Sequence, residues 1–216
     1  MDLANTGAAE APITTARQRL ALDLVEQVAV VLLYGWMTFR LWPGELTATN
    51  WYPLLILPSE GLVVILLLIR RRTERISTSW MDWLLAFGGT TAVLAIDKGG
   101  PAVMGLAGPA LMLTGLSVHI AAKLSLGRSF GLVAAHRGLK TSGLYQYVRH
   151  PIYAGYLLAH IGFLLAAPAL WNVAVYAVAW GLMIARIFAE ERVLGEDPAY
   201  RAYRTTVQYR LIPGVF

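Results

Sequence analysis

Six long apolar runs, separated by shorter polar segments, dominate the chain. They cover roughly Leu24–Trp42, Tyr52–Ile69, Trp80–Ile96, Val103–Ala122, Ile152–Ala167 and Trp171–Phe188. A helix needs about 20 mostly apolar residues to cross a bilayer. The pattern therefore predicts an all-α fold, a polytopic transmembrane bundle of about six helices. The count falls to five if the short fifth run, which Pro168 ends, does not cross fully.

The composition excludes an ordinary soluble domain. Hydrophobic residues make up 57% of the 216 residues and charged residues 14%, whereas soluble domains carry about 25% charged residues. The chain has no Cys, which removes disulfides, thiolate catalysis and cysteine metal sites. Its four His residues are irregularly spaced, so we expect no bound metal.

The basic residues predict an orientation in the membrane. Threading six spans from a cytoplasmic N-terminus places 16 of the 18 Lys and Arg residues on the cytoplasmic side and leaves Arg40 and Lys98 on the other. Cytoplasmic loops are enriched in Lys and Arg, so the net charge of +5 indicates a multi-pass membrane protein (inner membrane, if bacterial) rather than a nucleic-acid partner. Residues 1–16 lack the basic start of a signal peptide, so we expect a cytosolic tail there.

Two segments on the predicted cytoplasmic side hold most of the remaining polar chemistry. One is the loop Lys123–His150, and the other is the tail Glu190–Phe216. The fifth and sixth runs form a hairpin that returns the chain to the same side, so the two segments can meet. We therefore divide the chain into an N-terminal transmembrane region, residues 1–122, and a C-terminal core, residues 123–216.

The tail also predicts a short C-terminal helix. Asp197 is a favourable N-cap and Pro198 a favourable first helical residue. Tyr200, Tyr203 and Val207 would then share one face of this helix. We expect the helix to pack on the protein or to lie at the lipid surface.

The segment Gly138–Tyr156, GLKTSGLYQYVRHPIYAGY, has the densest pattern of chemically useful residues. Gly143 permits a tight turn or the close approach of a ligand. Pro151 suits the first position of the fifth helix, whose positive N-terminal end attracts anionic groups. The alternative is that Arg149 and His150 are interfacial anchors and the tyrosines form an aromatic belt.

A second cluster, Arg186, Glu190 and Glu191, lies at the end of the sixth run. Arg186 and Glu190 are four residues apart and so share a helix face. Two adjacent carboxylates at a membrane helix end are costly if they are buried without partners. The alternative is that they end the helix in water while Arg186 extends to the interface.

Isolated polar and small residues inside the apolar runs are further candidates. Glu60 lies near the middle of the second run, and an intramembrane carboxylate indicates function by default. The alternatives are an ion pair with Arg40 or a protonated carboxyl. His119 is expected to be a hydrogen-bonded interior residue, and Gly108 and Gly115, on one face of the fourth run, predict close helix packing.

The two clusters, in this order, resemble the isoprenylcysteine carboxyl methyltransferase family, part of a membrane methyltransferase superfamily that also includes phospholipid N-methyltransferases. The shared motifs are T-S-G-x-Y from Thr141, R-H-P-x-Y-x-G from Arg149, R-x-x-x-E-E-x-x-L from Arg186, Y-x-x-Y from Tyr200 and I-P-G from Ile212. The resemblance covers about Gly127–Phe216, and the joint pattern is more specific than any one motif. The N-terminal half contributes hydropathy only.

This resemblance implies a cytosol-facing pocket for S-adenosylmethionine, capped by the tail, with a tunnel to the bilayer. Carried over to this sequence, nine residues would bind the cofactor: Gly138, Leu139, Lys140, Tyr145, His150, Pro151, Ile152, Tyr153 and Glu190. Arg186 would bind the substrate, and Arg186, Glu190 and His150 would be the catalytic residues. The chain departs from the longer eukaryotic members in having Arg137 where they have a His, four residues before Thr-Ser-Gly.

The residue types suit methyl transfer. Glu190 can hydrogen-bond the amine or ribose of the cofactor, and an aromatic face such as that of Tyr145 can stabilise its sulfonium cation. A carboxylate or thiolate acceptor needs no general base. An amine or alcohol does, and Glu190, Glu191 or His150 would then be the candidates.

The sequence therefore predicts an integral membrane methyltransferase that uses S-adenosylmethionine on a lipophilic small molecule or membrane lipid. An isoprenylcysteine-like or isoprenoid carboxylate would suit Arg186, because a guanidinium can bind a carboxylate through two hydrogen bonds. A phospholipid N-methyltransferase and a non-catalytic membrane scaffold are alternatives. So is an NADPH-dependent reductase related to sterol reductases, although Ile152 and Tyr156 replace the Asn and Asp of the reductase motif. Whether O, N or S is methylated stays open.

Overall fold

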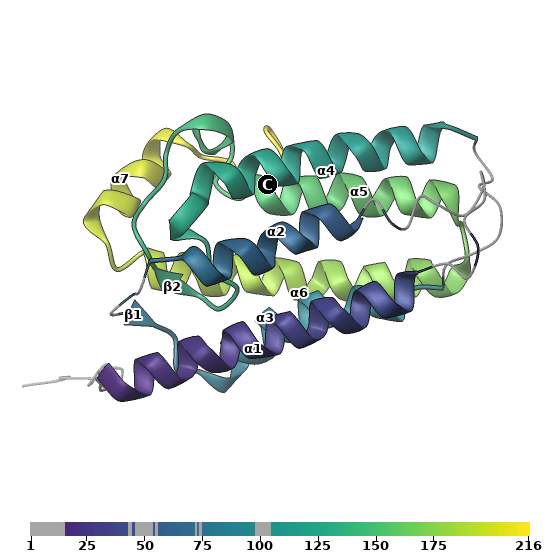
Figure 1. The fold of residues 1–216 in the computed structure, drawn as a ribbon. Coiled ribbons are helices and arrows are strands. Elements are labelled where there is room, and N and C mark those ends of the chain that lie inside the picture. Colours follow the sequence, from purple (N-terminus) through teal and green to yellow (C-terminus); the bar gives the residue numbers. More distant parts are fainter. Residues whose placement is uncertain are drawn as a thin grey trace, which may run out of the picture.

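The computed structural model describes residues 16–42, 56–71, 75–97 and 105–216, together with Glu45, Leu54 and Thr73. Six long helices form a bundle in these residues (Figure 1). They are α1 (Ala16–Leu41), α2 (Ile56–Ile69), α3 (Trp80–Ala92), α4 (Ala107–Leu126), α5 (Pro151–Ala166) and α6 (Leu170–Leu194). Most of the predicted cytosolic tail, Lys98 and the starts of the predicted second and fourth spans lie outside the described residues.

Each of the six helices falls on one of the six predicted apolar runs, so the helical class is confirmed. The predicted count of six spans is not. Three helices are long and apolar enough to cross a membrane, over Leu20–Arg40, Ala107–Ser129 and Leu170–Leu194. The other three have 14, 13 and 16 residues, and at about 1.5 Å per residue they are shorter than the roughly 30 Å hydrocarbon layer.

One end of the bundle gathers the polar segments. There the chain forms α7 (Pro198–Thr206) and a two-residue antiparallel ladder between β1 (Arg75–Ile76) and β2 (Ala135–His136), which the sequence did not predict (Figure 1). Asp197 caps α7 by accepting a hydrogen bond from the Ala199 backbone N–H at 2.8 Å, which confirms the predicted helix start.

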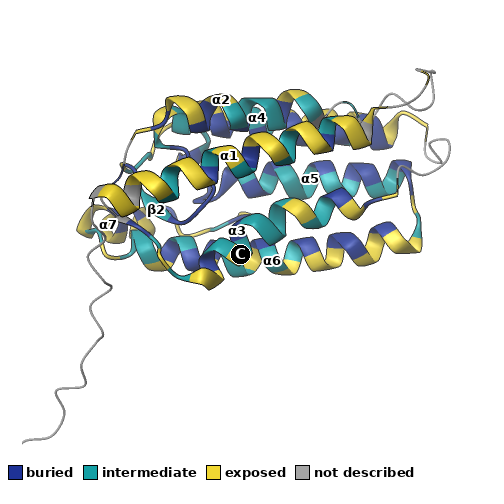
Figure 2. Ribbon diagram, turned by 60° about the horizontal axis from the view of Figure 1, so that its bottom comes forward, coloured by how far each residue is buried: buried dark blue, intermediate teal, exposed yellow. Residues whose placement is uncertain are grey.

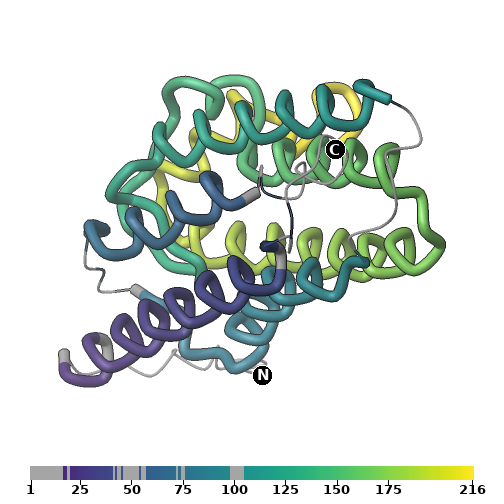
Figure 3. The backbone as a smooth tube through the Cα atoms, turned by 45° about the vertical axis from the view of Figure 1, so that its right-hand side comes forward, coloured from purple at the N-terminus to yellow at the C-terminus, as the bar shows by residue number. Residues whose placement is uncertain are grey.

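Glycines bring α4 and α5 into backbone contact along their length (Figure 3). A Cβ built on Gly155 would lie 2.7 Å from the Gly115 carbonyl oxygen, and one built on Gly162 would lie 2.8 Å from that of Gly108. The close packing predicted from Gly108 and Gly115 is therefore confirmed. α5 ends at Ala166, just before Pro168, as predicted.

Large apolar side chains lie exposed on the outer faces of the bundle (Figure 2). On α1, Phe39 is 82% exposed and Leu32 68%, and Val178 and Phe188 are exposed on α6. Such surfaces suit contact with lipid chains rather than water. The interior is packed on a few apolar clusters, one of which joins α1, α2 and the loop after α4.

Candidate functional site

A cavity of about 230 Å³ runs through the bundle and reaches the polar end. At that end its walls come from the loop after α4, from α6 and from the tail, including Gly138, Tyr145, Glu190 and Tyr203. Further along the helices its walls are mostly apolar. They include side chains of α1, of the turn after α3 and of α4: Val30, Met37, Val93, Met112 and Leu116.

The predicted site residues come together around this cavity. It is lined by eight of the nine predicted cofactor residues and by the predicted substrate residue: Gly138, Leu139, Lys140, Tyr145, His150, Ile152, Tyr153, Glu190 and Arg186. The exception is Pro151, which is buried at the start of α5 and does not line the cavity. Pro151 instead contributes to the site as the first residue of α5.

Glu190 is the centre of the polar end. Its Oε1 accepts hydrogen bonds from the Tyr153 hydroxyl at 2.5 Å and from Arg186 Nε at 3.1 Å. Its Oε2 has no hydrogen-bond partner among the described residues, and His150 Nδ1 lies 3.7 Å from it. Arg186 also lies over the Tyr153 ring, with 5.5 Å from its Cζ to the centroid. The Glu190 carboxylate is therefore held in place with one oxygen free.

Glu191 holds the tail against the start of α5. Its Oε1 accepts from Arg149 Nε at 2.7 Å and lies 3.3 Å from His150 Nε2, and its Oε2 accepts from Arg210 Nε at 2.9 Å. The backbone N–H groups of Arg149 and His150 donate to the carbonyls of Tyr209 and Arg210. Arg149 and His150 are each 6% exposed. These contacts do not support the alternative in which both are interfacial anchors.

The tail helix covers the loop. The Tyr203 hydroxyl donates to the Tyr145 carbonyl at 2.5 Å, and Asp197 Oδ2 lies 2.7 Å from His136 Nε2. Burial raises the pKa of Tyr203 to about 12 and that of Tyr145 well above its usual range, and the Glu190 carboxylate adds to the second shift. Both phenols therefore keep their protons near neutral pH. Tyr200, Tyr203 and Val207 form one buried cluster, as predicted.

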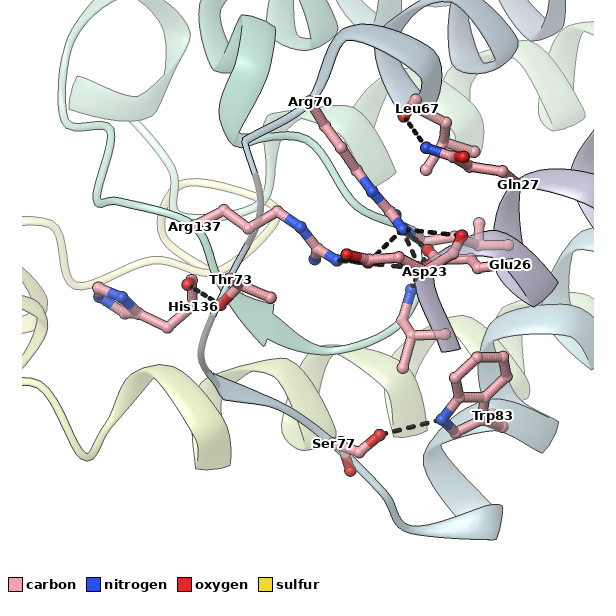
Figure 4. A network of polar contacts seen from close by, with 12 residues as sticks. Asp23, Glu26, Gln27, Leu67, Arg70, Thr73, Ser77, Trp83, His136 and Arg137 are labelled. Carbon is pink, nitrogen blue, oxygen red and sulfur yellow. Dashed lines mark hydrogen bonds and ion pairs between the residues drawn. The ribbon is translucent and has the colours of Figure 1, made fainter. Parts of the chain in front are cut away.

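An acidic pair on α1, which the sequence did not single out, holds the loop wall (Figure 4). Glu26 is fully buried, and its Oε1 accepts hydrogen bonds from the backbone N–H groups of Leu132 and Val133 at 2.8 and 3.0 Å. Its Oε2 accepts from Arg70 Nη1 at 2.7 Å. The Leu132 carbonyl in turn accepts from Arg186 Nη2 at 2.5 Å. Glu26 thus fixes a peptide that contacts the predicted substrate residue.

Arg137, at the position where the resemblance would have a His, belongs to the same network (Figure 4). Its Nη2 lies 3.3 Å from Asp23 Oδ1, which also accepts from Arg70 at 2.5 Å. Burial, and then the neighbouring Arg70 cation, lowers the pKa of Arg137. Arg137 lines the cavity, but its charge is directed to α1 rather than to Glu190.

A second carboxylate, Glu60, lines the cavity further from the polar end. Its Oε1 accepts from Lys123 Nζ at 3.3 Å and from the Tyr156 hydroxyl at 2.9 Å. The predicted start of the cytosolic loop at Lys123 is therefore wrong: α4 continues to Leu126, and Lys123 is fully buried. Arg40, the partner considered for Glu60, donates instead to backbone carbonyls of the segment after α3.

His119 is an interior residue, as expected. It is 1% exposed, and its Nδ1 lies 3.1 Å from the Ile152 carbonyl oxygen. Among the described residues, no group of three His, Asp or Glu side chains is placed to hold a metal ion.

The family model for isoprenylcysteine carboxyl methyltransferase (ICMT) matches residues 110–196. This segment of the chain is therefore similar to that family. The match includes His150, Arg186, Glu190 and Glu191, which the fold brings together at one end of the cavity. A search of curated proteins finds no match to the chain.

The similarity to the isoprenylcysteine carboxyl methyltransferase family supports a membrane methyltransferase, and three helices among the described residues are long and apolar enough to cross a membrane. The matched segment begins in α4 and ends just after α6. It therefore leaves out α1 and α2, which supply Glu26 and Glu60, and the tail helix α7.

Proposed function

We propose that the protein transfers a methyl group from S-adenosylmethionine to a lipophilic acceptor that enters from the membrane. The single observation that carries the proposal is the cavity, which joins the Glu190 end to an apolar end inside one bundle. A polar cofactor and a lipophilic acceptor can meet only where both environments are continuous. The alternatives of a reductase and of a scaffold have no comparable support.

The residues at the polar end fit the cofactor. Glu190 Oε2 is free to accept a hydrogen bond from the amine or a ribose hydroxyl, because Oε1 already holds Tyr153 and Arg186. Gly138 has a φ of 97°, a conformation that favours glycine, and lets the backbone approach a ligand closely. Tyr145 presents a buried aromatic ring, the surface that stabilises a cation such as a sulfonium.

S-adenosylmethionine, when bound, supplies a methyl group activated by the sulfonium. The protein's own contribution is binding, orientation and the exclusion of water. Tyr153 and Arg186 fix the Glu190 carboxylate, and Glu191 holds His150 beside it. The tail covers the loop through the Tyr203–Tyr145 hydrogen bond, which closes the polar end.

The acceptor is lipophilic in this proposal, and the expectation of an isoprenoid carboxylate depends on Arg186 alone. Two nitrogens of that guanidinium are already bonded, Nε to Glu190 and Nη2 to the Leu132 carbonyl. Among the described residues Nη1 makes no hydrogen bond, so it is the nitrogen of Arg186 that is left to donate to a bound acceptor.

We also propose that the polar end faces the cytoplasm. It contains α7, the loop after α4 and the end of α6, with Arg137, Lys140, Arg192 and Arg201 among their basic residues. The positive-inside rule places such segments on the cytoplasmic side. The division into a transmembrane region, residues 1–122, and a methyltransferase core, residues 123–216, is part of the proposal, although α4 runs across that boundary.

Calorimetry in detergent with S-adenosylmethionine tests the proposal. The wild-type protein should bind, and Glu190→Gln should bind at least about tenfold more weakly, since a hydrogen bond to a charged group contributes about 1.5–3 kcal/mol. Glu196→Gln, a change of an exposed carboxylate just after α6, is the matched control. Labelled methyl transfer into a total lipid extract then identifies the acceptor. Absence of binding by the wild-type protein would refute the proposal.

A further inference from the structure

A group of polar side chains lines the cavity beyond Arg186, and the cofactor site does not use it. Glu60 of α2 and Tyr156 and His160 of α5 all line this part of the cavity. Tyr156 lies about one helical turn after Tyr153 on α5, and His160 lies about two turns after Tyr153. The group is therefore about 5–10 Å further along α5 than Tyr153. A charged group in an apolar cavity needs an explanation.

Glu60 has one occupied and one free carboxylate oxygen. Among the described residues, every polar contact of the side chain is made by Oε1. Its partners are Lys123, Tyr156, Ser59 Oγ at 3.5 Å and His119 Nε2 at 3.6 Å. In the part of the chain that the structure describes, nothing donates a hydrogen bond to Oε2. The side chain is 13% exposed and borders the cavity. A ligand that donates an O–H or N–H would meet this acceptor.

His160 supplies a hydrogen-bond donor near that acceptor. Trp180 Nε1 lies 3.2 Å from His160 Nδ1, and an indole nitrogen can only donate. Nδ1 therefore accepts, and in the neutral ring the proton is on Nε2. No described residue accepts a hydrogen bond from Nε2. The His160 ring stacks on Tyr156, with centroids 5.8 Å apart, and Tyr156 is the residue that donates to Glu60.

We propose that Glu60 and His160 bind the hydroxyl group of a lipophilic alcohol or phenol. A hydroxyl both donates and accepts, so it can satisfy Glu60 Oε2 and His160 Nε2 together. A carboxylate at this position would face the Glu60 carboxylate, whose cationic partner Lys123 is already paired. An ammonium would face the His160 N–H. This inference rests on the proposed function, because it assigns the acceptor class for the same cavity.

The rest of the cavity suits the hydrocarbon part of such a lipid. Beyond His160 the walls are formed by apolar side chains of α1, of the turn after α3 and of α4: Met37, Leu94, Ile96 and Met112. Each of these is buried in the bundle. A prenyl or similar chain would replace water there, and each buried CH₂ would contribute about 0.8 kcal/mol.

Binding of three lipids that differ only in the head group tests the inference. Geraniol, geranic acid and geranyl methyl ether are titrated against the wild-type protein in nanodiscs, with affinity read from tryptophan fluorescence. Geraniol should bind about tenfold more tightly than the ether, equivalent to about 1.4 kcal/mol, and more tightly than the acid at neutral pH. Equal or tighter binding of the acid would overturn the inference.

Variants assign the effect to the two residues. Glu60→Gln and His160→Phe should each bring geraniol to about the affinity of the ether and leave the ether unchanged. Glu60→Gln leaves Lys123 without its partner, so His160→Phe decides the result if that variant does not fold. Tyr34→Phe, which removes another hydroxyl from the cavity wall, is the control and should change neither affinity.

The inference and the proposed function fail in different ways. If S-adenosylmethionine binds but the three lipids are indistinguishable, the hydroxyl site is refuted and the methyltransferase proposal stands. If geraniol is selected through Glu60 and His160 but no S-adenosylmethionine binds, the cavity recognises an alcohol and the methyltransferase proposal is refuted.

Discussion

The helices α1 and α2 and the segment from α4 to α6 contribute to the site in different ways. The family motifs and the family match lie in the later segment, and the two early helices contain none of these motifs. Yet α1 places Glu26 under the loop that contacts Arg186, and α2 places Glu60 in the cavity wall. Local motifs in the later segment mark the candidate site, whereas single buried charges on α1 and α2 complete its geometry.

The largest expected effect comes from α1. Glu26→Ala leaves Arg70 without one of its two acidic partners and leaves the N–H groups of Leu132 and Val133 unbonded, all in the interior. Breaking a buried pair in this way costs about 3–5 kcal/mol. Equilibrium unfolding in detergent measures the loss. Gln27→Ala, which removes one hydrogen bond to Leu67, is the control on the same helix, and an equal loss in both variants would contradict the role of Glu26.

A smaller effect is expected where the glycines of α4 and α5 bring the two backbones into contact, which we call the glycine seam. Gly155→Ala places a methyl group 2.7 Å from the Gly115 carbonyl, so α4 and α5 must move apart. Such overpacking costs about 1–3 kcal/mol. Gly181→Ala on α6, where nothing lies within 4 Å of the new Cβ, should be neutral or stabilising. Thermal unfolding of both variants compares them, and a stable Gly155→Ala protein would show that the seam adapts.

The cap of α7 should have an effect of about 1 kcal/mol. Asp197→Ala removes the acceptor for the Ala199 N–H and the contact with His136. Asp197→Asn keeps an acceptor oxygen and should recover most of the loss. Hydrogen exchange of the α7 amides is the measurement. Equal protection in wild type and Asp197→Ala would mean that the buried tyrosines alone hold this helix.

The smallest expected effect is a pH dependence at Tyr203. Burial raises the pKa of this phenol from 10.0 to about 12, so the folded state binds the proton more tightly than the unfolded state. The stabilisation is complete below about pH 10 and is lost as the pH rises through 12. The difference in unfolding temperature between wild type and Tyr203→Phe should therefore shrink from pH 8 to pH 11. It should not change between pH 6 and pH 8.

The sequence predicted the features that have local causes. Apolar runs located six helices, Asp197-Pro198 located the start of α7, and spaced glycines located the α4–α5 contact. The spacing of Arg186 and Glu190 predicted their contact, since four residues make one turn of helix. The roles assigned to the site residues remain predictions.

Other features depend on contacts between distant segments. Glu26 lies 106 residues from Leu132, and its partners are backbone N–H groups that no side-chain pattern reveals. The β1–β2 ladder joins two-residue segments that are too short to show an alternating pattern. The apolar run ends at Ala122, but α4 continues to Leu126, and only this extra turn brings Lys123 into the helix beside Glu60.

The glycine seam between α4 and α5 also restricts the route by which a lipophilic molecule can reach the interior of the bundle. Where the Gly115 and Gly155 backbones touch, there is no layer of side chains that could swing aside to open a gate. Sideways passage through this wall would require two whole helices to part. An opening through which a lipid could enter from the bilayer must therefore lie between other helices of the bundle.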